Sequence, residues 1–161
     1  MPAKDETSLT RISPPLRKWA TPIRELFPDP ENARKHDDRN LEAIAASLKR
    51  FGQQAPVVFV RRGKKKIVLK GSGLLKAASR ILHWKQLAAV ESGLAGADAT
   101  AYAIADNRAS DLSRFDTELL AAQLQELEGG DYDLQSAGFT EKEMAEPLKD
   151  PEAGADGSDA P

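Results

Sequence analysis

The feature that most constrains the fold of this chain is a run of helix and strand signals between residues 37 and 82. Asp37 comes directly before a stretch of helical periodicity, and Gly52 ends it. Within that stretch, apolar side chains recur at the spacing of one helix face: Leu41, Ile44, Leu48 and Phe51. Aspartate favours the start of a helix and glycine the position after its end, so the pattern predicts a helix between these two residues.

Two strands and a second helix are predicted next. Residues 56–60 and 65–69 have the composition of short strands, and the polar residues 61–64 separate them, which is typical of a β-hairpin. Residues 71–73, Gly-Ser-Gly, then interrupt the chain before an amphipathic helix over residues 74–82. Residues 87–90 have the composition of a third strand.

Three further helices complete the predicted fold. One runs from about Ala97 to Ser110, and another begins near Asp116 and is rich in leucine. Thr140 and Glu143 have the spacing of a capping box, which marks the start of a last short helix. The order helix, strand, strand, helix, strand, helix, helix predicts a small α/β (α+β) domain, in which helices pack on a short mixed sheet and a helical extension follows.

Composition suggests where the folded domain begins and ends. Residues 1–22 contain four prolines among charged and small polar residues, and residues 147–161 are acidic and rich in Ala, Gly and Pro. We therefore expect a flexible leader over residues 1–22, a folded domain over residues 23–146 and a disordered acidic tail over residues 147–161. No apolar run is long enough to span a bilayer and no signal peptide is visible, which predicts a cytoplasmic protein without membrane contact.

Two residue types narrow the chemistry. The chain has no cysteine, which excludes disulfides and thiol catalysis, and its two histidines are too few for a typical zinc site. Charge is divided unevenly: residues 1–90 hold 19 Lys and Arg against 8 Asp and Glu, and residues 91–161 hold 4 against 17. The basic half could face a polyanion such as DNA. Equally, the two halves could neutralise each other, or the acidic tail could serve only as a solvated segment.

The loop between the second strand and the second helix is the first candidate binding site. It consists of Lys70, Gly71, Ser72 and Gly73. Glycines at such a place let the backbone approach a ligand, and the free N–H groups of a helix start favour an anion such as phosphate. Glycine turns of this kind also occur for conformational reasons alone, so both interpretations remain open.

Two other polar clusters are candidates. Asn32, Arg34 and His36 precede the first helix on a loop, where binding residues often gather, although a solvated helix entrance would look the same. Asp106, Asn107 and Arg108 end an otherwise apolar helical stretch. Asp106 could act as a catalytic residue that orients water or holds Mg²⁺, and an arginine beside it could contact a phosphate. The alternative is a helix end with local hydrogen bonds.

The predicted hairpin carries the densest basic run in the chain, and we interpret it as a DNA-binding element. Its cations are Arg61, Arg62, Lys64, Lys65 and Lys66. Lysine and arginine on an exposed turn bind phosphates without reading a base sequence. Alternatively, these charges could protect the edge of a sheet from pairing with another chain.

The order of these motifs resembles the ParB/sulfiredoxin superfamily over roughly residues 24–146. The resemblance rests on residues 32–36 (Asn-Ala-Arg-Lys-His), on the helix ending at Gly52 with residues 54–58 after it, and on residues 71–78. Residues 103–108 (Ala-Ile-Ala-Asp-Asn-Arg), followed by Phe115-Asp116 and residues 137–140, are similar to the branch of ParB-like proteins found in phages and beside DNA methyltransferases.

The resemblance implies a nucleotide pocket of the kind in which partition proteins hold CTP with Mg²⁺. By position, Gly71 and Gly73 would line the phosphates, Arg34 would approach from the first loop, and residues 106–108 would stand near a second contacting segment. DNA is the implied macromolecular partner, and a homodimer is compatible with the family.

Two departures from the family pattern shift the expectation from catalysis toward binding. Leu74 occupies the position of the usual loop arginine, and Ser72 that of a frequent histidine or asparagine. Leucine cannot make the bidentate phosphate contact of a guanidinium. Sulfiredoxin chemistry is excluded because it needs a cysteine. The chain is also expected to lack the helix-turn-helix that reads specific DNA sites in full partition proteins.

The function predicted from the sequence is therefore that of a ParB-like DNA- or nucleotide-binding accessory protein, encoded by a phage or mobile element, with weak or absent catalysis. One alternative is a metal-dependent nucleotide hydrolase or nuclease that uses the Gly71 loop and Asp106. The other is a protein-interaction module with a degenerate pocket, whose acidic tail would bind a protein partner.

Overall fold

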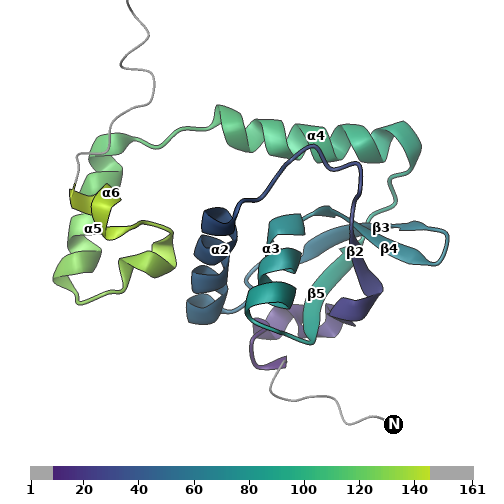
Figure 1. The fold of residues 1–161 in the computed structure, drawn as a ribbon, viewed down its shortest axis with the longest axis horizontal. Coiled ribbons are helices and arrows are strands. Elements are labelled where there is room, and N and C mark those ends of the chain that lie inside the picture. Colours follow the sequence, from purple (N-terminus) through teal and green to yellow (C-terminus); the bar gives the residue numbers. More distant parts are fainter. Residues whose placement is uncertain (1–8, 146–161) are drawn as a thin grey trace, which may run out of the picture.

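The computed structural model describes residues 9–145, which form a mixed sheet with helices on both of its faces (Figure 1). The strands are β1 (Ala20–Pro22), β2 (Leu26–Pro28), β3 (Val57–Arg62), β4 (Lys65–Lys70) and β5 (Gln86–Glu91). The α-helices are α2 (Asp38–Phe51), α3 (Ser72–Lys76), α4 (Gly96–Leu112), α5 (Thr117–Gly129) and α6 (Glu141–Ala145). Shorter turns of helix are η1 (Pro14–Trp19), η2 (Ile23–Glu25), η4 (Leu134–Ala137) and η3 (Ala77–Ile81), a π-helical turn that continues α3.

The sheet has the strand order β1-β5-β3-β4-β2, which confirms the predicted short mixed sheet. Strands β3 and β4 form the expected antiparallel hairpin, while β5 runs parallel to β3 on its other side. The two strands that the sequence pattern did not predict, β1 and β2, lie at opposite edges. The base of the hairpin therefore lies inside the sheet. Strand β5 pairs with β3 only over residues 57–59 and β2 with β4 only over residues 66–68, so the charged tip extends beyond its neighbours and the edge-protection alternative stays open.

Helix α2 forms as its sequence predicts. The Asp37 carboxylate accepts a hydrogen bond from the backbone N–H of Asn40 at 2.8 Å, which satisfies one of the free donors of the first turn. Gly52 ends the helix at φ +71°, and its amide donates to the carbonyl of Leu48. A Cβ at this position would lie 2.6 Å from the carbonyl oxygen of Arg11, so the close approach of two backbones also requires glycine here.

Strand alternation gives the sheet two apolar faces. On one face Val57, Phe59 and Val68 pack against α2, α3 and η3, which lie side by side in Figure 1. On the other face Val60, Ile67 and Leu69 pack against Ala99 and Tyr102 of α4. Successive side chains of a strand point to opposite faces, so the hairpin supplies both cores, and α4 is held over the face opposite α2.

The ordered structure starts earlier than the predicted boundary at residue 23. Ile12 is fully buried and forms a β-bridge with Gln53, η1 packs on β5, and β1 pairs with β5 from Ala20 to Pro22. The expected flexible leader thus does not extend over residues 9–22. Its first eight residues, and the predicted acidic tail over residues 147–161, lie outside the described part of the chain.

Gln53 joins this N-terminal segment to the sheet and is the largest polar side chain in the core. Its Nε2 donates to the carbonyls of Ala55 (3.0 Å) and Ala88 (2.9 Å), and its Oε1 accepts from the backbone N–H of Ala88 at 2.7 Å. The side-chain amide thereby pairs with Ala88 of β5 as the backbone of a neighbouring strand would. It supplies hydrogen-bond partners to the buried N–H and carbonyl of Ala88.

The C-terminal helices form a separate layer beside α2, on the left of Figure 1. The rings of Phe51 and Tyr132 stack with centroids 6.5 Å apart, and Arg39 forms an ion pair with Glu143. Glu143 also completes the predicted capping box, because its carboxylate accepts from the Thr140 backbone N–H at 2.9 Å and its own N–H donates to the Thr140 hydroxyl. Within residues 9–145, no helix is long and apolar enough to cross a membrane.

Candidate functional site

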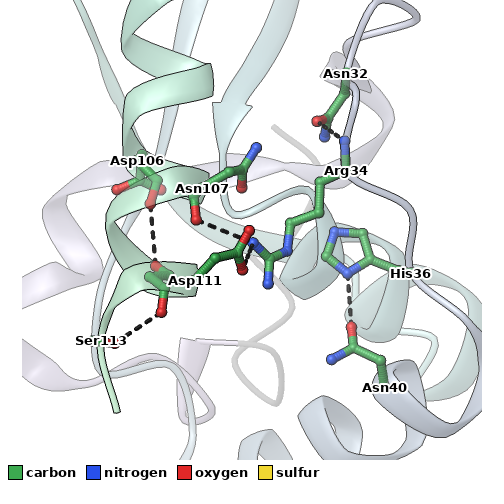
Figure 2. Close-up of polar contacts among 9 residues, drawn as sticks. Asn32, Arg34, His36, Asn40, Asp106, Asn107, Asp111 and Ser113 are labelled. Atoms are coloured by element: carbon green, nitrogen blue, oxygen red, sulfur yellow. Dashed lines mark hydrogen bonds and ion pairs between the residues drawn. The ribbon is translucent and has the colours of Figure 1, made fainter. Parts of the chain in front are cut away.

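The loop between β2 and α2 places three of the predicted site residues. The side-chain oxygen of Asn32 accepts a hydrogen bond from the backbone N–H of Arg34 at 2.9 Å, which closes a tight turn. This turn directs the Arg34 side chain away from the loop and toward α4 (Figure 2).

Arg34 attaches the loop to α4. Its Nη1 lies 2.9 Å from Oδ1 of Asp111 and donates to the carbonyl of Asn107 at 3.4 Å. The side chains of Arg34 and Asp111 are 39% and 53% exposed. An ion pair this exposed contributes at most about 1 kcal/mol, so the guanidinium can exchange its carboxylate for another anion at little cost.

His36 lies between the same loop and the glycine loop. Its Nδ1 is 2.7 Å from Oδ1 of Asn40, which fixes the ring beside the first turn of α2 (Figure 2). A Cβ at Gly73 would lie 2.7 Å from Cε1 of His36 and 2.9 Å from Cδ1 of Ile44. Glycine at position 73 therefore allows the histidine to lie directly against the start of α3.

The glycine loop itself is tightly constrained. Gly71 has φ +94°, and a Cβ there would lie 2.6 Å from Cγ1 of the buried Val57. Ser72 is 5% exposed, and its hydroxyl oxygen has no hydrogen-bond partner in the structure. Buried hydroxyls are normally paired, so this group has unused capacity to bind a ligand or water atom. Leu74 packs against the core cluster between the sheet and α2.

Lys70 and Asp106 connect the end of β4 to α4. Nζ of Lys70 lies 2.7 Å from Oδ1 of Asp106, and this hydrogen bond raises the pKa of Lys70 above its usual value. The two side chains are 48% and 27% exposed. Lys70 of the glycine loop thus directly contacts Asp106 of α4, and both segments were predicted to lie near a bound phosphate.

A groove of about 510 Å³ lies between the β2–α2 loop and α4. Its polar lining comes from four residues of the predicted site together with Lys35 and Asp111: Asn32, Arg34, Asn107 and Arg108. The structure therefore brings together two of the three predicted clusters in one cavity. The third, the glycine loop, adjoins them through the contacts of His36 with Gly73 and of Lys70 with Asp106.

The residues present do not fit a magnesium site by themselves. Within residues 9–145 no three His, Asp or Glu side chains cluster closely enough to hold a metal ion. The carboxylate of Asp106 is held by an ammonium group, whereas Mg²⁺ needs free oxygen ligands. The same pairing leaves Asp106 poorly placed as a catalytic group, so its predicted catalytic and metal-binding roles gain no structural support.

The cations of the hairpin are largely engaged within the protein. Arg61 pairs with Glu91, Arg62 with Asp29 and Lys66 with Glu25, at 3.0, 2.9 and 2.6 Å. The bond to Lys66 lowers the pKa of Glu25 below its usual value. Lys65 lies over the ring of Phe27. Lys64 has no ion pair among the described residues. The predicted DNA-binding run thus offers less free charge than its sequence indicates.

Sequence reasoning missed two residues that shape the site, Asp111 and Asn40. Asp111 was missed because it lies 77 residues after Arg34, its partner. Asn40 was missed because it looks like an ordinary exposed residue in the first turn of a helix. A helical wheel of α4 would place Asn107 and Asp111 on one face, one turn apart. It would not identify Arg34 as their partner.

Comparisons with known proteins place this arrangement in context. A family model described as the ParB-methyltransferase HTH domain matches residues 118–161. The chain is similar in structure to the C-terminally truncated chromosome-partitioning protein ParB from Caulobacter crescentus complexed with CTP-gamma-S, with a TM-score of 0.66 and 18% identity over 78% of this chain and 73% of that one. The same ParB complexed to the centromeric parS site gives a TM-score of 0.48 at 17% identity, over 78% and 67% of the two chains. No curated protein matches the chain.

The family match corrects one prediction. The chain was expected to lack a helix-turn-helix, yet the matched region begins within α5 and includes η4 and α6. The expectation failed because leucine periodicity and the capping box around Thr140 predict helices, but they do not reveal the angle at which two helices meet. The match also extends over residues 147–161, where composition alone suggested an unstructured tail.

Proposed function

From the ParB-like fold of this chain, and from the segment that matches a ParB-associated helix-turn-helix, we propose that the protein binds DNA. We also propose that its N-terminal domain binds a nucleoside triphosphate with little or no hydrolysis. One observation carries the nucleotide part of the proposal. The β2–α2 loop and α4 line one groove, although they are far apart in the sequence. The glycine loop adjoins them through the contact of Lys70 with Asp106.

The groove offers the chemistry that a triphosphate needs. Arg34 is held by an exposed ion pair with Asp111 and a 3.4 Å hydrogen bond to the carbonyl of Asn107, and Arg108 is exposed beside it. Guanidinium groups bind phosphate oxygens in a bidentate manner, which supplies both affinity and orientation. The unpartnered Ser72 hydroxyl and the backbone at Gly71 add polar groups at the start of α3. The similar Caulobacter protein was crystallised with CTP-gamma-S, so CTP is the first nucleotide to test.

Binding without turnover follows from two features of the site. Leu74 is packed against the core and cannot contact a phosphate as the usual arginine would. The Asp106 carboxylate is paired with Lys70 at 2.7 Å, so its oxygen already has a partner within the protein. We therefore propose an accessory, DNA-binding role, and the methyltransferase-associated helix-turn-helix supports an origin in a phage or mobile element.

Thermal denaturation with CTP, ATP and GTP, each with and without Mg²⁺, tests the nucleotide site. A ligand at a hundredfold excess over its dissociation constant stabilises the folded state by about 2.7 kcal/mol. We expect CTP to raise the melting temperature of the wild type and to have little effect on Arg34→Ala. Arg24→Ala is the control, because this arginine is exposed and lies outside the groove.

The ligand-dependent shift is the quantity to compare, since Arg34→Ala also loses its ion pair with Asp111. The nucleotide proposal fails if no nucleotide shifts the wild type, or if Arg34→Ala responds as strongly as the wild type does. Appreciable release of phosphate in the same samples would refute the absence of hydrolysis.

A further inference from the structure

A second exposed surface lies at the side of the domain opposite α4, and neither the nucleotide groove nor the helix-turn-helix segment includes it. It is formed by the N-terminal segment from residue 11 to η2 and by the segment from η3 into β5. In Figure 1 the N-terminal turn of helix lies on the far side of the sheet from α4.

Backbone pairing fixes these two segments side by side. Pro22 of β1 is opposite Gln86 of β5, and the N–H of Ile23 donates to the carbonyl of Lys85 at 2.9 Å. Helix η1 packs on β5, and the N–H of Trp84 returns to the carbonyl of Ala78 at the start of η3. The side chains of both segments therefore project from one continuous, rigid part of the fold.

This surface is strongly basic, and its one carboxylate within residues 11–25 and 76–90 is that of Glu25 in η2, which pairs with Lys66. We define the basic face by its six exposed cations: Arg11, Arg17, Lys18, Arg24, Arg80 and Lys85. Neither residues 9–24 nor residues 76–90 contain an aspartate or glutamate. The exposed His83 lies among them, and Trp19 is 39% exposed with Nζ of Lys18 4.3 Å from its ring centroid.

The cations of the basic face differ from those of the hairpin because none of them forms an ion pair within residues 9–145. The ion pairs in that range involve Arg34, Arg39, Lys70 and three hairpin residues. Of the six cations of the basic face, Arg24 acts on a carboxylate at longer range: it adds to the effect of Lys66 in lowering the pKa of Glu25. Arg17 donates to the carbonyl of Ile12, which leaves its charge uncompensated. Clustered like charges repel one another, so an extended polyanion fits this surface well.

We propose that the basic face binds the phosphate backbone of duplex DNA without reading its sequence. The inference rests on the proposed DNA binding of the chain and adds to it a contact surface outside the helix-turn-helix. Lysine and arginine contacts to phosphates supply affinity and salt dependence but carry no sequence information. One chain would then contact DNA through two separate surfaces, the basic face and the helix-turn-helix segment.

The test compares two double variants that remove equal charge from different places. Lys18→Gln/Lys85→Gln removes two charges from the basic face, and Lys49→Gln/Arg50→Gln removes two from the last turn of α2. All four residues are exposed and none forms an ion pair within the described chain. Binding of a fluorescent duplex of random sequence is measured by anisotropy at increasing salt, and melting temperatures confirm that both variants fold.

Each phosphate contact contributes about 0.9 to the slope of log K against log salt. We expect the basic-face variant to lose about 1.8 units of slope and the control less than about 0.9. If the basic-face double variant does not fold, Lys85→Gln alone should lose about 0.9.

Equal slopes for the wild type and the basic-face variant, or an equal loss in the control, would overturn the inference and leave the proposed function intact. A wild type that binds no DNA even at low salt would instead refute the proposed DNA binding itself.

Discussion

Replacing Gln53 by leucine isolates the role of the one buried amide that bridges the N-terminal segment and the sheet. Leucine is close in size to glutamine, so the core keeps its volume. The variant loses the two hydrogen bonds donated by Nε2 and the one accepted by Oε1. Both the N–H and the carbonyl of Ala88 lose a partner, and the Gln53 side chain is fully buried.

The expected loss of stability is about 2 kcal/mol. Each buried backbone group left without a partner costs about 1–3 kcal/mol, so the N–H and carbonyl of Ala88 together cost about 2–6 kcal/mol, whereas Ala55 is exposed and its carbonyl can bond to water. Burial of the apolar leucine side chain recovers about 1.5–3 kcal/mol, which leaves a net loss of about 2 kcal/mol. Domains of this kind have total stabilities of about 5–15 kcal/mol, so the variant should still fold.

Urea denaturation followed by the fluorescence of Trp19 and Trp84 provides the assay. With a slope of about 2 kcal/mol per molar urea, the midpoint should fall by about 1 M. Gln54→Leu is the matched control, because its neighbouring amide is exposed and donates only to the carbonyl of Phe51. A midpoint for Gln53→Leu within about 0.3 M of that control would refute the assignment of the amide as a substitute for backbone pairing.

Two further predictions concern local geometry and pH. Gly52→Ala and Gly63→Ala both place alanine at positive φ, at an expected cost of about 1 kcal/mol, but only at Gly52 does the new Cβ meet a backbone atom, the carbonyl oxygen of Arg11 at 2.6 Å. Gly52→Ala should therefore be clearly the less stable in urea, and equal midpoints would contradict the close approach. The backbone N–H of Thr140 holds the pKa of Glu143 below its usual 4.5. The contribution of the Glu143 carboxylate to stability is therefore complete above pH 4.5, and it is lost as the pH falls through the lower pKa that this group has in the folded state. The amide NMR shift of Thr140 should follow this transition in the wild type and lack it in Glu143→Gln; an unchanged titration in the variant would exclude the capping box as its cause.

The elements that the sequence predicted correctly are those with local signals. Asp37, Asp116 and Thr140 each cap a helix through atoms only a few residues away, so their meaning is readable from spacing alone. The hairpin and the Gly71 loop are equally local. Helix α4 was predicted from its alanine-rich composition, although its wheel shows no distinct apolar face.

The parts that the sequence did not reveal depend on contacts between distant segments. Strands β1 and β2 have three residues each, too few for a period-two pattern, and their pairing with β5 and β4 decides that they are strands. The sequence does not distinguish the buried Gln53 from its exposed neighbour Gln54, because the burial of Gln53 depends on the contact with β5. In the candidate site, the predicted clusters lie near one another, but the partners of Arg34 and Asp106 come from other elements. Those partners decide which charges are free.

The positions of β1 and β2 have a consequence for the shape of the sheet and for its behaviour in crowded solution. These strands occupy opposite edges of five strands, about 19 Å apart if the sheet were flat, at the usual spacing of 4.8 Å. Yet only η2 separates them, and the four steps from Pro22 to Leu26 span at most about 14 Å. The sheet must therefore curl until its edges approach each other. Each edge is also formed by a strand of only three residues, so it offers few free backbone groups with which the strand of another chain could pair.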